Sequence, residues 1–161
     1  MIGQTFGHMR NKIFTQLLQN KNIIKSLVVE SKNFLDIELN GEQQQYINNP
    51  HLLIRNYIYP YKRIFDTTTE KKTIISMQLS DFYKQGKNYR NGLLTFYILT
   101  PIELENTNYG MRYDYIGDEL ETIFEQTTIG EFNFQSRGDI DVGDRYIGQY
   151  ISFKVVNFHI V

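Results

Sequence analysis

MRYDYIGDELETIFE, residues 111–125, is the clearest amphipathic helix in this 161-residue sequence, and the rest of the chain is interpreted around it. Five apolar side chains recur within it at a helical period and therefore share one side. They are Tyr113, Ile116, Leu120, Ile123 and Phe124. We predict that this side of the helix is buried.

The opposite side of the same helix is acidic. Its carboxylates repeat at helical spacing with no Lys or Arg among them, and they are Asp114, Asp118, Glu121 and Glu125. Like charges four residues apart cost a helix a few tenths of a kcal/mol each. The positive end of the helix dipole offsets part of that cost for Asp114 and Asp118. We therefore seek a role for this acidic stripe beyond the stability of the helix itself.

The composition predicts one soluble domain. A chain of 161 residues buries about 70% of its unfolded surface on folding, which is enough for a hydrophobic core. The chain has no Cys, and its net charge is -1, which excludes thiolate metal sites and a global attraction to nucleic acid or anionic membranes. No apolar run approaches the roughly 18 residues of a membrane span, and a signal-peptide pattern is missing. We expect a protein that is made in a cytoplasm and has no membrane partner.

The N-terminal part is predicted to be helical from about residue 9 to 30. Apolar residues have helical spacing up to Leu18, and the pattern resumes at Ile23 after an Asn-Lys-Asn break. Asn22 is the candidate cap of the second piece. Two short helices, or one broken helix, are expected here.

Residues 31–56 are predicted to be a loop-rich insertion. The apolar positions of residues 34–39 suit a short strand, and Asn40-Gly41 predicts a turn. The polar residues 42–45 are expected to form a loop.

A sheet is predicted in the remainder of the chain, about residues 57–161. Residues 54–65 are expected to form an edge strand or extended arm, because Pro60 has no backbone donor for a central ladder. Four further strands are predicted at residues 73–82, 92–100, 129–135 and 150–160. The strand at 92–100 is apolar on both faces and is expected at the centre of the sheet. The last strand changes phase, which a bulge near Val155 would reconcile.

The order helix, hairpin, helix, hairpin predicts the fold class. We expect a single small α+β domain, with a mostly antiparallel sheet and helices packed on one face.

Residue spacings typical of a metal site are missing. The three histidines, at positions 8, 51 and 159, have no ligand spacing. Asp139, Asp141 and Asp144 begin like a calcium loop, but the ligands expected further along are missing. We therefore predict an acidic turn, within a loop over residues 137–144.

Catalytic templates also fail. Glu70-Lys71-Lys72 resembles a nuclease element, but only Asp66 is near and no second carboxylate is fixed by a strand, so a polar turn is predicted. The chain has no Gly-rich phosphate loop, no Gly-x-Ser-x-Gly and no Cys nucleophile. We predict no catalytic residues, no cofactor and no metal.

The remaining candidate site is a charged surface. Residues 84–91 are predicted to be a projecting loop between two strands, with basic and aromatic side chains at Lys84, Lys87, Tyr89 and Arg90. This loop and the acidic stripe are opposite in charge, so the loop of one subunit suits the acidic helix of the next. Because the two patches differ, such a contact propagates into a ring or a filament. The alternative is that both are ordinary solvated faces.

A resemblance to a known family rests on five segments. They are IYPY (58–61), DTTTE (66–70), GLLTFY (92–97), YDYIGDEL (113–120) and IGEF (129–132). In this order, they resemble neck proteins of tailed bacteriophages, in particular the tail-terminator or head-to-tail joining group. The likeness covers roughly residues 54–161.

The resemblance implies a structural protein without enzymatic activity. Its members form rings, often hexamers, that surround the DNA channel at the head-proximal end of the tail. The implied partners are other copies of the chain, the neighbouring neck, portal-adaptor and tail-tube proteins, and genomic DNA that passes without sequence recognition. The implied location is the virion, after assembly in the bacterial cytoplasm. Whether the chain is a terminator or another neck ring stays open.

Our leading hypothesis is therefore a ring-forming virion component. The alternative is a nucleic-acid-binding or processing protein of a mobile element, which would bind DNA in a salt-sensitive way. A small hydrolase would instead need carboxylates that converge in a pocket with shifted pKa values. The acidic stripe has two candidate roles, subunit contact and lining of the DNA channel.

Overall fold

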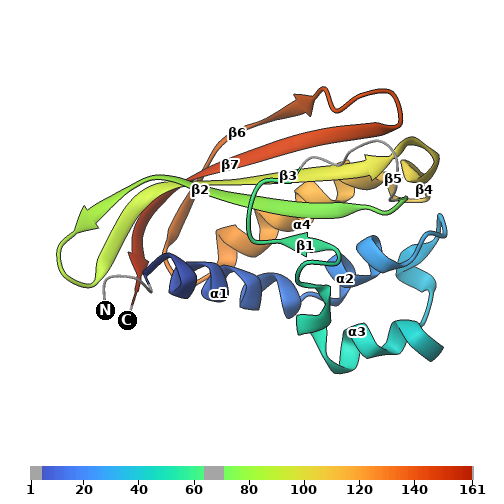
Figure 1. Ribbon diagram of the computed structural model, residues 1–161, viewed down its shortest axis with the longest axis horizontal. Helices are drawn as coiled ribbons and strands as arrows, with labels where there is room; N and C mark the ends of the chain where they lie inside the picture. Colours follow the sequence, from blue (N-terminus) through green and yellow to red (C-terminus); the bar gives the residue numbers. More distant parts are fainter. Residues whose placement is uncertain (1–4, 64–70, 161) are drawn as a thin grey trace.

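A five-stranded sheet in the order β1-β2-β3-β7-β6 forms one layer of the protein, and helices cover one of its faces (Figure 1). The computed structural model describes residues 5–63 and 71–160. The strands are β1 (Ile58–Tyr59), β2 (Ile74–Gln85), β3 (Tyr89–Pro101), β6 (Glu131–Ile140) and β7 (Tyr146–His159). β1 runs parallel to β2, and the other neighbours are antiparallel. The predicted α+β class, with a mostly antiparallel sheet, is confirmed.

The helical layer consists of α1 (Thr5–Leu18), α2 (Lys21–Val28) and α4 (Arg112–Gln126). The prediction of two N-terminal helices is confirmed, but Asn22 does not cap the second one. The Asn20 side chain accepts a hydrogen bond from the Ile23 amide at 3.0 Å. Asn20 is the cap because α2 begins at Lys21, and the free amides of its first turn therefore point back to that position.

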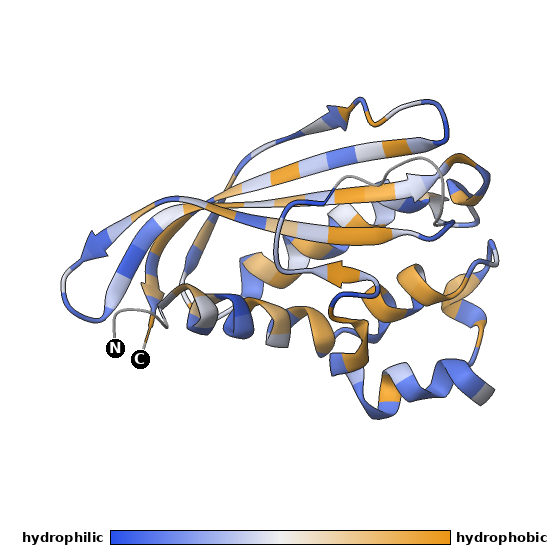
Figure 2. Cartoon of the chain, viewed as in Figure 1, coloured by the Kyte–Doolittle hydropathy of each residue, from blue (hydrophilic) through white to orange (hydrophobic). Residues whose placement is uncertain are grey.

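The predicted central helix is confirmed as α4. Tyr113, Ile116, Leu120 and Phe124 are buried, while Ile123 is half-buried. Figure 2 shows hydrophobic residues on the facing parts of the helices and the sheet. At the centre, the Phe124 ring lies 5.3 Å from Phe96 and 5.0 Å from Phe132, measured between ring centroids. The helix is therefore held to the sheet through an aromatic cluster.

Residues 31–56 contain short helices where a strand and a loop were predicted. They are η2 (Phe34–Asp36), η3 (Gly41–Gln44), α3 (Gln45–Asn48) and η4 (Pro50–Leu53). The strand prediction at 34–39 is wrong because Phe34 is fully buried against Tyr109 and Tyr115, at ring distances of 4.9 and 5.1 Å. That packing directs the Phe34 side chain into the core. Among the described residues, no strand pairs with this segment.

The boundaries of the hairpins also differ from the prediction. β2 and β3 run through most of residues 84–91, so the turn is only Gly86 to Asn88, with Gly86 at a φ of +71°. β6 likewise extends to Ile140, into the predicted 137–144 loop. The β2–β3 hairpin projects at one end of the sheet, as expected for a basic tip (Figure 1).

Three finer predictions about the sheet are confirmed. β3 lies between β2 and β7, at the centre, and β1 is an edge strand, although it has only two residues. β7 carries the expected bulge: Val155 pairs with Gly92 and Phe158 with Arg90, and Asn157 between them has a φ of +52°. The bulge returns Phe158 to the buried face.

Short elements connect β3 to α4. They are η5 (Ile102–Leu104) and a small hairpin of β4 (Asn106–Thr107) and β5 (Gly110–Met111). In the part of the chain that the structure describes, no helix is long and apolar enough to cross a membrane.

Arg112, the first residue of α4, fastens the helical layer together. Its side chain is 1% exposed and donates to five backbone carbonyls. Its Nε donates to Leu104, Nη1 to Ser26 and Val29, and Nη2 to Glu30 and Ser31, over distances of 2.8 to 3.3 Å. The guanidinium has five N–H groups, so every donor has a partner. Burial lowers the pKa of Arg112 to about 10, and at neutral pH the group stays charged.

We predict that Arg112→Lys lowers the free energy of unfolding by about 2–4 kcal/mol, because an ammonium has three donors and leaves buried carbonyls unsatisfied. Urea unfolding followed by circular dichroism measures the change. The matched control is Arg55→Lys, at an exposed position, with an expected change within about 0.5 kcal/mol. Equal stability of the two variants would contradict a central role for Arg112.

Candidate functional site

The acidic stripe of α4 meets a cation that lies far away in sequence. Arg137 on β6 reaches across the helix, and its Nη1 is 2.7 Å from Asp118 Oδ1 and 3.1 Å from Glu121 Oε1. Its Nη2 is 3.8 Å from Asp114 Oδ1 and also donates to the Asp114 carbonyl at 2.9 Å. Three carboxylates of the stripe thus share one partly buried guanidinium within the same chain.

A glycine and a glutamine shape this cluster. Arg137 Nε donates to Gln149 Oε1 at 2.6 Å, and Gln149 Nε2 donates to Asp114 Oδ1 at 2.7 Å. Gly117 lies beneath the guanidinium: a Cβ atom at this position would be 2.5 Å from Arg137 Nη2 and 2.6 Å from Gln149 Oε1. Arg137 can therefore lie flat across α4 only because residue 117 has no side chain.

The protonation of Arg137 is secured by its neighbours. Burial lowers the pKa of this guanidinium, but the hydrogen bonds that it donates to Asp118 and Glu121 outweigh that effect and raise the pKa overall. Arg137 is thus a permanent cation at the centre of the cluster.

Two tyrosines of α4 donate to carboxylates outside the Arg137 cluster. The Tyr113 hydroxyl donates to Asp139 at 3.0 Å, and the Tyr115 hydroxyl donates to Glu119 at 3.2 Å. Burial, followed by the hydrogen bond to Asp139, raises the pKa of Tyr113 to about 12. Burial and the charge of Glu119 raise the pKa of Tyr115 as well. Both phenols stay protonated at neutral pH and act as fixed donors.

Glu125 differs from the other members of the stripe. It is exposed, and in the described structure it has no hydrogen bond or ion pair. Four carboxylates and the single charge of Arg137 leave the stripe with a net negative charge. Glu125, which has no partner in the described structure, is the carboxylate most accessible to an external cation. Of the four stripe residues, Glu125 is therefore best suited to a contact between molecules.

The predicted basic residues lie at the tip of the β2–β3 hairpin. Lys84 and Lys87 are exposed, Arg90 is half-buried and bonds only its neighbour's carbonyl, and the ring of Tyr89 packs against His159 at 5.1 Å. No hydrogen bond or ion pair among residues 5–63 and 71–160 links this tip to α4. The structure therefore keeps the two predicted patches apart within one chain.

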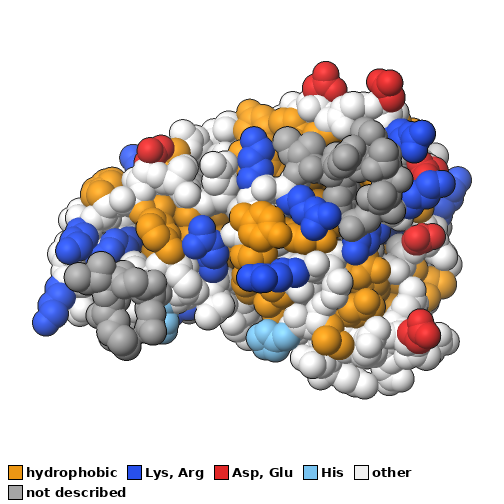
Figure 3. All heavy atoms as spheres, viewed as in Figure 1, with side chains coloured by type: hydrophobic (Ala, Val, Ile, Leu, Met, Phe, Trp, Pro, Cys, Tyr) orange, Lys and Arg blue, Asp and Glu red, His pale blue; other side chains and the backbone are white. Residues whose placement is uncertain are grey.

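Basic and acidic residues are unevenly distributed along the sequence. Because of the strand order, they are also unevenly distributed across the sheet. Residues 1–100 contain 13 Lys or Arg and 7 Asp or Glu, whereas residues 101–161 contain 4 and 11. The first part supplies β1, β2 and β3, and the second supplies α4, β7 and β6. The side of the sheet formed by β1, β2 and β3, with the segments beside it, is thus richer in Lys and Arg, and the side with β6, β7 and α4 is richer in Asp and Glu. Figure 3 shows Lys and Arg spread across one face, with Asp and Glu at its upper and right margins.

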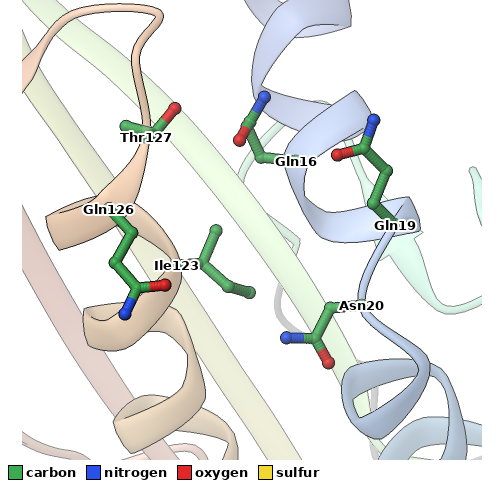
Figure 4. Close-up of a pocket in the computed structure, with 6 residues that line it drawn as sticks. All are labelled: Gln16, Gln19, Asn20, Ile123, Gln126 and Thr127. Atoms are coloured by element: carbon green, nitrogen blue, oxygen red, sulfur yellow. The ribbon is translucent and has the colours of Figure 1, made fainter.

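A groove of about 290 Å³ lies between α1 and α4 (Figure 4). Its lining is Gln16, Gln19, Asn20, Ile123, Gln126 and Thr127. Amides, a hydroxyl and one aliphatic side chain line it, so the groove offers hydrogen bonds but no acid, base or nucleophile of the kinds used in catalysis.

The candidate metal residues that the structure describes do not form a cluster. Within residues 5–63 and 71–160, no three His, Asp or Glu side chains come together in a way that would hold a metal. Asp139 accepts from Tyr113, and Asp141 accepts from the Gly143 amide at 3.2 Å, as in an acidic turn. Asp66 and Glu70 lie outside the described residues.

Sequence reasoning missed the two arginines that organise α4. Arg112 and Arg137 are two of only four cations in residues 101–161, which also contain 11 carboxylates. A cation isolated in an acidic segment is a signal for an internal ion pair. That signal was present in the sequence. Residues 137–144 were predicted to be a loop, however, so Arg137 was not placed on a strand beside α4.

Comparison with known protein families identifies the family of this chain. A family model named YomW matches residues 20–155, which is most of the chain. The family consists of proteins from Bacillus phages of the SPBc2 type, and the match indicates a phage-derived protein. No curated protein matches the sequence.

We predict that Arg137→Met lowers the free energy of unfolding by about 1–3 kcal/mol, because three carboxylates then face one another without a counter-charge. The loss should shrink when salt is raised from 0.05 to about 1 M, since screening reduces the repulsion. Denaturant unfolding at both salt concentrations measures it. A loss that is independent of salt would show that only packing of the side chain matters.

Gly117→Ala provides a second test through a double-mutant cycle. In the native background, we expect a loss of about 1–2 kcal/mol despite the higher helix propensity of Ala, because the methyl group displaces Arg137 and Gln149. In the Arg137→Met background, the same change should cost less or become stabilising. The same cost in both backgrounds would contradict the arrangement of Arg137 over Gly117.

Proposed function

Because this chain belongs to the YomW family of phage-derived proteins, we propose that it is a structural virion component that forms a ring at the head-tail junction. The observation that carries the proposal is the unequal distribution of charge between the two sides of the sheet, with cations in excess before residue 101 and carboxylates in excess after it. Identical copies with unlike edges associate head to tail, and such contacts close into a ring when the rotation between copies permits. The phage neck resemblance of residues 54–161 agrees with this role.

The proposed contact joins the basic hairpin tip of one copy to the acidic side of α4 in the next. Lys84 and Lys87 are exposed at the tip, and Glu125 is exposed near the end of α4. Opposite charges at an interface mainly select the partner and the orientation. The hairpin projects beyond the helical layer, which gives it the reach for a neighbouring molecule (Figure 1).

A structural role also suits the interior of the molecule. Arg137 and its three carboxylates pair with one another within the chain. The groove between α1 and α4 has no ionisable lining. We therefore propose a non-enzymatic protein without a cofactor, located in the virion neck as a terminator or an adjoining ring. Its partners would be other copies, neighbouring neck and tail-tube proteins, and DNA in the channel.

A second candidate function is nucleic-acid binding, and one observation favours it. Cations lie over tyrosine rings beside β1: Lys62 Nζ is 4.7 Å from the centre of the Tyr97 ring, and the Arg63 guanidinium carbon is 4.5 Å from that of Tyr59. Basic and aromatic side chains together are common in single-strand binding surfaces. Binding of the isolated subunit to DNA, with an affinity that falls steeply with salt, would favour this candidate over the ring.

Light scattering after size-exclusion chromatography tests the ring, and electron microscopy counts its subunits. We expect a mass several times that of one chain, and we expect Lys87→Glu with Arg90→Glu to reduce it without unfolding the protein, because these charges would then repel the acidic edge of the next copy. Reversing Glu125 to Lys in the same variant should restore part of the assembled mass.

The control keeps the net charge change but moves it away from the hairpin. Lys21→Glu with Lys32→Glu alters two cations outside the sheet and should leave the mass unchanged. A native protein that stays monomeric at low and physiological salt would overturn the proposal. An equal loss of mass in the control would show that net charge, and not the hairpin contact, controls assembly.

A further inference from the structure

We infer that the free edge of β6 in one copy pairs, antiparallel, with the free edge of β2 in the next copy, so that the sheets of neighbours join. This inference rests on the proposed ring and names the surface that would build it. It concerns the backbone of the edge strands, whereas the proposed function needs only the charges at the hairpin and on α4.

Both edges have unused backbone groups. β1 covers β2 only at Ile75 and Ser76, so from Met77 onward β2 pairs with β3 alone among the described residues. β6 pairs only with β7 within the same part of the chain. Exposed strand edges of this kind are ready to accept another strand.

The strand directions favour the pairing. β2 and β7 run one way and β3 and β6 the other, because neighbours from β2 to β6 are antiparallel. Copies related by rotation about an axis along the strands keep the same direction. β6 of one copy then meets β2 of the next in antiparallel orientation, which is the more stable ladder per residue.

The charges fall at matching levels. Lys84 lies near the hairpin end of β2, and Glu131 begins β6 at that same end of the sheet, where it pairs with Val156 of β7. At the other end, Lys71 and Lys72 precede β2, while Asp141 and Asp144 follow β6. With little stagger, Lys84 of one copy lies near Glu131 of the next at the hairpin end, whereas at the other end β1 lies between β2 and the neighbouring strand.

An exposed aromatic ring lies on the same edge. Phe134 shares a row of the sheet with Phe153, Leu94 and Leu79, and these three are buried or half-buried. Phe134 is 51% exposed. A neighbouring β2 would place its Leu79 beside Phe134 and cover the ring, which extends the apolar row across the boundary.

Bulges limit the stretch that pairs. β2 has a bulge after Ser80, where Asp81 has a φ of +55°, and β6 has one between Phe134 and Ser136. Pairing beyond Ser80 would be interrupted, so the joined segment is short and centred on Met77 to Ser80. A short ladder supported by opposite charges at its hairpin end would be reversible and would suit stepwise assembly.

Crosslinking tests the inference directly, because the natural chain has no Cys. Ser80 and Asn133 lie in one row of the sheet, through Leu93 and Lys154. In the variant Ser80→Cys with Asn133→Cys, a short bis-maleimide should produce a ladder of covalent trimers and larger species on a denaturing gel. Within one chain these positions are three strand spacings apart, about 14 Å, which is beyond the reach of a short linker.

The single variants Ser80→Cys and Asn133→Cys, and the pair Ser80→Cys with Ser31→Cys, are the matched controls and should give no ladder. Assembled mass by light scattering without a ladder in the test pair would overturn edge pairing and leave the ring intact. Monomeric mass without a ladder would overturn both. Dimers from either single variant would show a symmetric contact in place of the head-to-tail one and would also overturn the inference.

Discussion

Everything in the helical layer depends on a buried positive charge whose donors are all used. Arg112 has five N–H groups and five carbonyl partners, drawn from the end of α2, the residues after it and the connection before α4. A buried guanidinium without such partners would cost several kcal/mol. The C-terminal end of α2 carries the negative end of its helix dipole, which favours a cation at this place. The ring of Phe34 covers the guanidinium at 4.8 Å and closes the site.

That fixed start determines what the rest of α4 can do. With Arg112 at the first position, the apolar side chains face the sheet and the acidic stripe turns toward β6, where Arg137 lies across Gly117. One arginine therefore sets the position of the helix, and the other removes most of the repulsion along its acidic side. The stripe is partly an internal structural element: Asp118 is exposed but pairs with Arg137, and Glu125 is exposed without a partner among the described residues. This finding separates the roles of residues that share one periodic pattern in the sequence.

The parts of the fold that the sequence predicts are the elements with one buried face and one more exposed face, because their apolar residues recur at a single period. α4, β2, β3 and the bulge in β7 follow from apolar periodicity, because each element has a core face of the right period. Periodicity did not predict residues 136–140 of β6. The edge strand has mostly polar residues there, and its pairing with β7 is decided by neighbours in the fold and not by a local pattern. The strand predicted around Phe34 was wrong for a related reason. Phe34 is buried against Tyr109 and Tyr115, which are far away in sequence, and the segment forms a short helix. Four of the five Arg112 contacts span 81 to 86 residues, and the contacts of Arg137 with α4 span 16 to 23, so neither has a local periodicity.

The separation of charge has an electrostatic cost, repulsion between like charges, that contacts within a single molecule relieve only in part. At physiological ionic strength the screening length is about 8 Å, so like charges within one edge still repel their neighbours, while the opposite edge is too far away to relieve them. Mixing the charges along the sequence would remove that cost and leave the net charge unchanged. A sequence with 13 of its 17 cations in the first 100 residues, yet a net charge of only -1, would therefore gain from a neighbour that presents the other side. The proposed head-to-tail contact between copies would supply such a neighbour at every boundary, and a closed ring would leave no side without its counterpart.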